Sequence, residues 1–77
     1  DPLGDFERTT QALEKEHGLR DLSIDWFTLR DLPTVIREGN WTVTVAVWMD
    51  REIIKVWPGQ VEDYYGMAID VGTTTVA

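Results

Sequence analysis

The last stretch of the sequence carries the residues best suited to chemistry. An apolar run ends at Asp70, Gly72 follows two residues later, and Thr73 and Thr74 come directly after it. Gly72 lets backbone amides approach a phosphate closely, and the two threonines can donate hydroxyl and amide hydrogen bonds to phosphate oxygens. Asp70 can hold a magnesium ion through water, since magnesium keeps several of its waters. The pattern indicates a nucleotide phosphate site, and a threonine-rich β-turn is the alternative.

The other residues that could take part in catalysis or metal binding have no suitable partners near them in the sequence. The single histidine, His17, lies near the end of a predicted helix, where a positive charge is favourable, so we expect a capping or surface role. The only serine, Ser23, is not in a glycine elbow and does not indicate a catalytic triad. Glu14 and Glu16 are too close in sequence to face each other on a helix. We predict no catalytic residue and no metal site formed by this chain alone.

Composition excludes several classes of protein. The chain has 77 residues with 14 acidic and 7 basic side chains, and its net charge of −7 is unfavourable for binding nucleic acid. No apolar run approaches the ~18 residues of a membrane span, and no signal peptide is evident, so no membrane partner is expected. The absence of cysteine excludes disulfides and cysteine-held iron–sulfur clusters within the chain, and it fits a cytoplasmic location.

Two helices are predicted in the first half of the chain. Residues 6–17 form the first, with Asp5 as its cap, an apolar stripe at one face and Gly18 at its end. The stripe comprises Phe6, Thr10, Leu13 and His17. After a short strand within residues 22–24, Asp25 caps a second helix that ends at Gly39. Pro33 deletes one helical hydrogen bond, so we expect a kink, or a break with Asp31 capping a new helix.

A β-hairpin follows, with strands at residues 41–49 and 52–57 and a turn at Asp50-Arg51. This turn pairs Val47 with Ile54 and Val45 with Val56. One face of the hairpin is then aliphatic and covered by the helices, and it comprises Val43, Val45, Val47, Ile54 and Val56. The other face comprises Thr42, Thr44, Trp48, Ile53, Lys55 and Trp57. On that face Trp48, Ile53 and Trp57 form a possible docking surface for a neighbouring domain or partner, and a second core layer is the alternative.

The fold class predicted is α+β, with two helices, the second kinked at Pro33, packed on a small sheet built around the hairpin. The chain stops inside an apolar run, so we expect it to be a piece of a longer protein. A strand starting at Gly66 has then lost its own sheet and is orphaned. We expect residues 60–77 to be wholly or partly disordered, or to form an improvised edge strand.

A family resemblance rests on several of these segments. Residues 68–75 resemble the first phosphate motif of the actin-like ATPase and sugar kinase (ASKHA) superfamily, and residues 65–77 resemble the ATP-dependent reductive activators of corrinoid proteins. Residues 29–33, Leu-Arg-Asp-Leu-Pro, are similar to a Leu-Arg-x-Leu-Pro segment of those activators. Residues 41–45 and the Pro58-Gly59 pair are similar to their hairpin.

The resemblance implies a parent protein with a ferredoxin-like [2Fe–2S] domain, a linker and an ATPase region. Such activators use ATP to drive electron transfer to cob(II)alamin on a corrinoid protein of a methyltransferase system, which gives cob(I)alamin. Residues 1–59 would be the linker domain, and residues 60–77 a connector and the first strand of the truncated ATPase domain. The implied phosphate and magnesium contacts are Asp70, Gly72, Thr73 and Thr74. The implied partners are the neighbouring domains and, through the parent, the corrinoid protein.

Two alternatives remain open from the sequence. The parent could be a kinase or another activator ATPase of the same superfamily, although about 65 residues ahead of the phosphate motif argue against a simple sugar kinase. The chain could also be a stand-alone interaction module that uses Trp48 and Trp57 as anchors, since tryptophan is common at binding hot spots.

Overall fold

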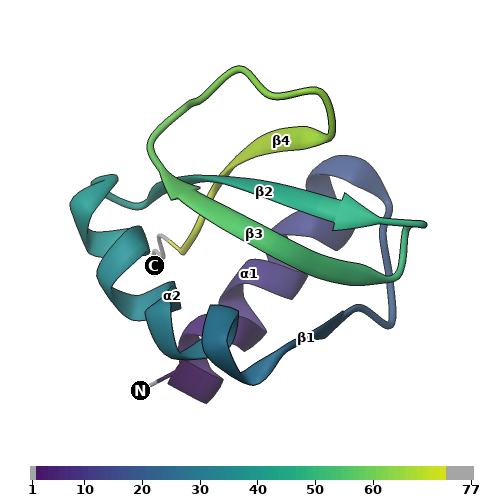
Figure 1. Ribbon diagram of the computed structural model, residues 1–77, viewed down its shortest axis with the longest axis horizontal. Helices are drawn as coiled ribbons and strands as arrows, with labels where there is room; N and C mark the ends of the chain where they lie inside the picture. The colour runs from purple at the N-terminus through teal and green to yellow at the C-terminus, as the bar shows by residue number, and fades with distance from the viewer. Residues whose placement is uncertain (1, 73–77) are drawn as a thin grey trace.

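The chain forms two helices and a four-stranded sheet, which a computed structural model describes for residues 2–72 (Figure 1). The elements in order are α1 (Pro2–His17), β1 (Ser23–Ile24), α2 (Trp26–Glu38), β2 (Thr42–Trp48), β3 (Glu52–Pro58) and β4 (Gly66–Asp70). The strand order is β1-β3-β2-β4, with β1 parallel to β3 and the other pairs antiparallel. The predicted α+β class is therefore confirmed. In this part of the chain neither helix is long and apolar enough to cross a membrane.

A single apolar core joins the helices to one face of the sheet. Both helices contribute to it, and so do β2, β3, β4 and the residue after β4. Its buried members are Ala12, Leu13, Leu32, Ile36, Val43, Val45, Val47, Ile53, Ile69 and Val71. On the other side of the sheet, the connector between β3 and β4 arches over the strands (Figure 1).

Helix α1 starts earlier than predicted, and its buried face is rotated. It begins at Pro2, a position where the missing N–H of proline costs nothing. Asp5 lies inside the helix and is buried, so the prediction that it caps the helix is wrong. The buried stripe is Asp5, Thr9, Ala12 and Leu13. Gly18 ends the helix with φ +73°, as predicted, and its N–H donates to the Glu14 carbonyl at 2.9 Å.

Helix α2 is capped as predicted but is not broken. The Asp25 carboxylate accepts a hydrogen bond from the Thr28 backbone N–H at 2.8 Å. The helix continues through Pro33 to Glu38, so the alternative of a break with Asp31 as a new cap is wrong. Leu32 and Ile36 on either side of the proline are fully buried. Their burial outweighs the single hydrogen bond that proline removes.

The hairpin has the predicted register at its open end and a different one near its turn. Val45 pairs with Val56 as expected, but Val47 pairs with Ile53, because a β-bulge leaves Ile54 as an extra residue on β3. Ile53 is therefore buried in the core, and Ile54 is 43% exposed, the reverse of the prediction. The turn is also shifted: the Arg51 N–H donates to the Trp48 carbonyl at 2.9 Å.

The residues inside this turn explain the shift. Met49 and Asp50 both have positive φ, at 57° and 58°. Two successive residues in the left-handed region are typical of the type I′ turns that match the twist of a hairpin. The turn therefore centres one residue earlier than the predicted Asp50-Arg51, and the bulge at Ile54 restores the pairing beyond it.

Strand β4 is an edge strand of this sheet and is not orphaned. It pairs antiparallel with β2, from Thr42 opposite Asp70 to Ala46 opposite Gly66. Ile69 and Val71 are buried in the common core. Of the expectations for the end of the chain, the edge strand is thus confirmed for residues 66–70. Residues 73–77 lie outside the described residues.

Candidate functional site

The predicted phosphate-binding residues begin at the end of β4, which the rest of the domain holds in place. The Thr42 hydroxyl donates to the Asp70 carboxylate at 3.0 Å, and the Val71 N–H donates to the Trp41 carbonyl at 2.7 Å. Gly72 has φ +71°, and a Cβ added there would lie 3.4 Å from Cδ of Arg8. The end of β4 is therefore held by β2 on one side and approached by α1 on the other. Thr73 and Thr74 lie outside the described residues.

The cofactors expected from the resemblance belong to the parent protein and stay a prediction. Asp70 is exposed at the strand end, and magnesium is usually bound through one or two carboxylates together with substrate phosphates and several waters. Within residues 2–72 no group of three or more histidine, cysteine or acidic side chains could hold a metal ion. An iron–sulfur cluster does not fit this chain, because the chain has no cysteine.

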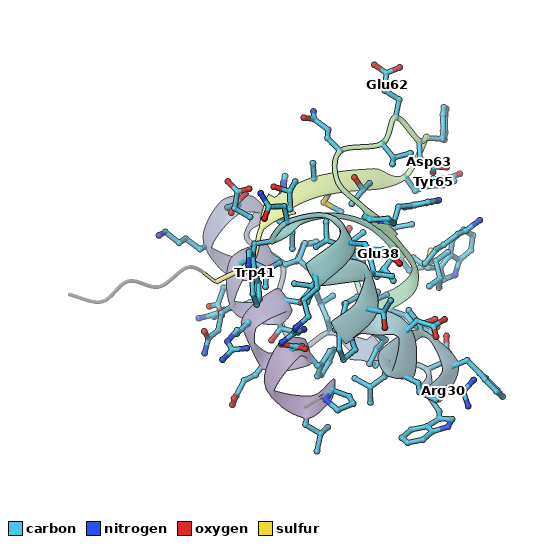
Figure 2. All side chains as sticks on the ribbon, turned by 90° about the vertical axis from the view of Figure 1, so that its left-hand side faces the viewer. Arg30, Glu38, Trp41, Glu62, Asp63 and Tyr65 are labelled. Atoms are coloured by element: carbon cyan, nitrogen blue, oxygen red, sulfur yellow. The ribbon has the colours of Figure 1, made fainter. Side chains whose placement is uncertain are left out.

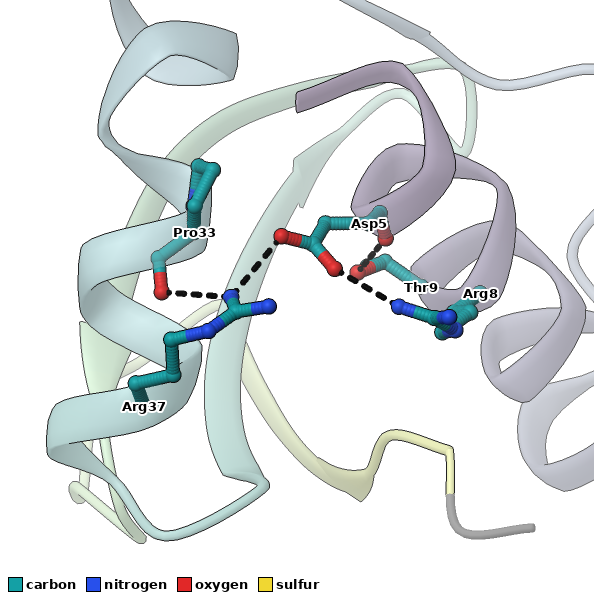
Figure 3. A network of polar contacts seen from close by, with 5 residues as sticks. All are labelled: Asp5, Arg8, Thr9, Pro33 and Arg37. Atoms are coloured by element: carbon teal, nitrogen blue, oxygen red, sulfur yellow. Dashed lines mark hydrogen bonds and ion pairs between the residues drawn. The ribbon is translucent and has the colours of Figure 1, made fainter. Parts of the chain in front are cut away.

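A buried carboxylate next to this region was missed by the sequence reasoning. Asp5 pairs with Nη1 of Arg8 at 3.0 Å and with Nη1 of Arg37 at 2.9 Å, and so joins α1 to α2 (Figure 3). Arg37 also donates to the Pro33 carbonyl at 3.0 Å. The signal was present in the sequence, since Asp5, Thr9 and Ala12 are spaced to share one helix face.

The turn between α2 and β2 connects this ion-pair network to the end of β4. The Arg37 guanidinium lies 5.1 Å from the centre of the Trp41 ring. Trp41 and Asn40 both have positive φ, at 71° and 55°, and for a residue as bulky as tryptophan this is unusual. Figure 2 shows Trp41 beside the point where β4 ends, where its carbonyl accepts the Val71 N–H. Trp41 therefore links Arg37 to the strand that carries Asp70.

The connector covers the centre of the second face of the sheet. From the sequence, this face could have been either a docking surface or a second core layer. Thr44 is buried there, where its hydroxyl donates to the Gly59 carbonyl at 2.7 Å and accepts from the Val61 N–H at 2.9 Å. Trp57 is half-buried, with the Lys55 ammonium 5.2 Å from its ring centre.

The predicted docking surface changes in composition. Trp48 is exposed on this second face, whereas Ile53 is buried on the opposite, helix-covered face because of the bulge. Including Ile53 with Trp48 and Trp57 was therefore wrong. The ring of Tyr65 lies next to Trp48 instead, with the two centroids 6.3 Å apart.

Outside these regions, the pKa shifts of Asp25 and Arg20 are explained by local hydrogen bonds. The hydrogen bond from the Thr28 backbone N–H, followed by that from the Thr28 hydroxyl, lowers the pKa of Asp25. The hydrogen bond to Glu14 raises the pKa of Arg20. His17 is exposed in the last turn of α1, in agreement with a surface role. None of these groups adjoins Asp70 or Trp48 in the strand pairing, so they do not contribute to either candidate region.

Comparison with protein families identifies the domain. A family model described as the RACo linker region matches residues 1–63. The chain belongs to this family of activator linkers. Comparisons with curated proteins and with solved structures found no match. The RACo linker match ends before β4, so Asp70 and Gly72 lie beyond it, and the division of the chain at residue 59 stays a prediction.

Proposed function

We propose that this RACo linker joins an electron-donating domain to an ATPase domain in an activator that reduces cob(II)alamin to cob(I)alamin on a corrinoid protein. The observation that carries the proposal is the family match over residues 1–63. A [2Fe–2S] cluster on a preceding domain would supply the electron. This chain would contribute no catalytic residue of its own.

The physical role proposed for the linker is that of a folded spacer. A glycine- and serine-rich linker behaves as a flexible coil, whereas a domain with a buried core keeps its dimensions. Residues from both helices and three strands share such a core, and the longest extent of the structure is 35 Å. Electron transfer requires close approach, so a spacer of fixed size would limit the positions from which the donor domain can reach the corrinoid.

The end of β4 would connect this spacer to nucleotide binding. Asp70, Gly72, Thr73 and Thr74 are the residues that would contact the phosphates and magnesium of ATP. Thr42 holds the Asp70 carboxylate at 3.0 Å, and Val71 is bonded to Trp41. A displacement of this strand end on nucleotide binding would therefore act directly on the linker sheet.

The test is to replace residues 5–58 in the full-length parent by a glycine- and serine-rich segment of equal reach. We expect ATP-dependent formation of cob(I)alamin, followed by absorbance, to be lost. Cluster content and ATP binding are measured in parallel. The replacement also removes Thr42 and Trp41, which hold the end of β4, so only a loss of cob(I)alamin formation with both properties retained is assigned to the spacer. Full-length parent with Trp26→Ala, a change on the surface of the linker, is the control. Unchanged cob(I)alamin formation after the replacement would contradict the spacer role.

A further inference from the structure

Three aromatic side chains form an exposed row beside the hairpin turn. The row comprises Trp48 at the end of β2 and Tyr65 and Tyr64 in the connector that precedes β4. Trp48 and Tyr65 meet edge to face at 6.3 Å, and Tyr65 and Tyr64 at 5.0 Å. Their exposed fractions are 49% for Trp48, 53% for Tyr65 and 91% for Tyr64. The rings thus orient one another while leaving much of their surface open to a partner.

Three other aromatic rings among residues 2–72, those of Phe27, Trp41 and Trp57, each have a cation of the chain over the ring. The guanidinium of Arg30 lies 5.5 Å from the centre of the Phe27 ring, and Trp41 and Trp57 have Arg37 and Lys55 in the same relation. Within residues 2–72 no cation lies over the aromatic row. Most basic side chains are already engaged with carboxylates or rings, namely Arg8, Arg20, Arg30, Arg37 and Lys55. The row therefore has ring faces but lacks the cation found at Phe27, Trp41 and Trp57.

Carboxylates flank the row. Glu62 and Asp63 directly precede the two tyrosines, and the Asp63 carboxylate accepts the Tyr65 backbone N–H at 3.1 Å. Glu52 pairs with Trp48 across the hairpin, and Arg51 lines the same hollow beside Trp48, so three carboxylates outnumber one cation around the row in the described part of the chain. Figure 2 shows Glu62, Asp63 and Tyr65 together on the connector, at the outer edge of the molecule. Negative charge beside open ring faces favours a cationic group over an apolar or anionic one.

We propose that the aromatic row is a docking site for a basic segment of a protein partner. An arginine or lysine of that segment would lie over the rings of Trp48, Tyr65 or Tyr64, and Glu62 and Asp63 would attract it. Tyrosine and tryptophan are the side chains most often found at such hot spots. The inference goes beyond the spacer role and does not depend on ATP or a corrinoid.

The test is an NMR titration of the 77-residue chain with the peptide acetyl-Gly-Arg-Gly-Arg-Gly-amide. We expect saturable shifts of the Trp48 indole N–H and of the Tyr64 and Tyr65 amides. The matched probe replaces both arginines by citrulline, which has nearly the same shape without the charge. Citrulline should weaken binding about threefold or more, since an exposed cation–π contact is worth about 0.5–1 kcal/mol. Equal binding of both peptides, or no saturable shift at the row, would overturn the proposal.

Variants locate the binding on the row. Tyr65→Leu removes a ring but keeps an apolar side chain, and it should weaken the arginine peptide about threefold. Trp26→Leu is the control, because Trp26 is also exposed but belongs to no ring pair among residues 2–72. Equal weakening by both variants would overturn the assignment to the row.

The contribution of charge has its own variant. Glu62→Gln with Asp63→Asn removes two charges and keeps an oxygen for the Tyr65 N–H. We expect it to weaken binding and to reduce the dependence of affinity on salt concentration, since exposed charges are screened by salt. Unchanged affinity and unchanged salt dependence would show that the carboxylates take no part and would contradict the proposed basic partner.

Discussion

The two faces of the sheet are covered in different ways. The face under α1 and α2 is packed with aliphatic side chains, and Val43, Val45, Ile53 and Val71 there are inaccessible to solvent. The face under the connector is held at its centre by one hydroxyl, that of Thr44, which bonds to both Gly59 and Val61. At the edge of that second face lie the open rings of the aromatic row.

The difference separates the face that stabilises the fold from the face that carries the proposed docking site. Burial of aliphatic side chains supplies most of the free energy of folding, so the helix-covered face carries the fold. The connector-covered face depends on a few hydrogen bonds and leaves its aromatic side chains accessible. The proposed partner would therefore contact the second face without disturbing the core.

The largest expected effect is at Gly39, which ends α2 and lies against Thr42 and Gly59. A Cβ at this position would lie 2.1 Å from the Thr42 carbonyl oxygen and 2.4 Å from the Gly59 nitrogen, which are themselves hydrogen-bonded at 2.8 Å. Gly39→Ala should lower the free energy of unfolding in urea by about 4 kcal/mol or abolish folding. Gly18→Ala is the control, because no atom lies within 4 Å of the added Cβ, and its positive φ should cost only about 1–2 kcal/mol. Equal losses would contradict the close approach at Gly39.

The bulge in β3 can be tested with two adjacent isoleucines. Ile53→Ala should lower the free energy of unfolding by about 2–4 kcal/mol, because Ile53 is fully buried. Ile54→Ala should cost less than about 1 kcal/mol, because Ile54 projects from the bulge with 43% of its surface exposed. A larger loss for Ile54→Ala than for Ile53→Ala would contradict the bulge and would support the unbulged register expected from the sequence.

The next largest loss of stability is expected at Asp5, whose ion pairs join α1 to α2. Asp5→Asn removes a buried charge that Arg8 and Arg37 share, and it should lower the free energy of unfolding by about 2 kcal/mol. Glu14→Gln, in the exposed pair with Arg20, should change it by less than about 0.5 kcal/mol. Chemical denaturation of both variants gives the comparison, and similar small effects would mean that Asp5 does not hold the helices together.

On the connector-covered face the expected loss is smaller and local. Thr44→Val has nearly the same shape and removes the hydrogen bonds to Gly59 and Val61, so we expect a loss of about 1–2 kcal/mol. Amide exchange should accelerate in residues 59–65 and remain slow in α1. Thr10→Val, which removes an exposed hydrogen bond to Glu7, should leave the connector unchanged. Uniform acceleration throughout the chain would argue against a separate role for the connector face.

The smallest effect is the pH dependence of the α2 cap. The Thr28 hydrogen bonds lower the pKa of Asp25 below its ordinary value of 3.8. The ionised cap therefore stabilises the fold above about pH 4, and this contribution is lost as the pH falls through 3.8 towards the lower pKa of the folded state. By urea denaturation, Asp25→Asn should be slightly less stable than wild type at pH 7, and this difference should shrink as the pH falls below 3.8. A constant difference across this range would exclude the charge as the cause.

Local signals in the sequence predicted much of the fold. Asp25 and Gly18 act on backbone groups within one helical turn, so the start of α2 and the end of α1 could be predicted from residue type alone. The open end of the hairpin followed from alternation, which places Val45 opposite Val56.

Features that depend on distant contacts did not follow. The bulge at Ile54 compensates for a turn in which Met49 and Asp50 take positive φ, and neither residue type demands this. Asp5 is typical of a helix cap, and its burial depends on two partners, Arg8 in the same helix and Arg37, which lies 32 residues later in the sequence. The pairing of β4 with β2 was offered only as an edge-strand alternative. Of the docking surface Trp48 was predicted, whereas Tyr65 reaches it only through the path of the connector.

The central claim is that the strand leading to Asp70 and Gly72 is built into the linker domain. Amide exchange at Val71, measured by NMR on the 77-residue chain, tests it most directly, because this N–H donates to the Trp41 carbonyl at 2.7 Å. We predict protection at Val71 comparable to that of Val45 in the centre of the sheet. Exchange as fast as at exposed Tyr64 would contradict the claim and would detach the predicted phosphate-binding end from the linker.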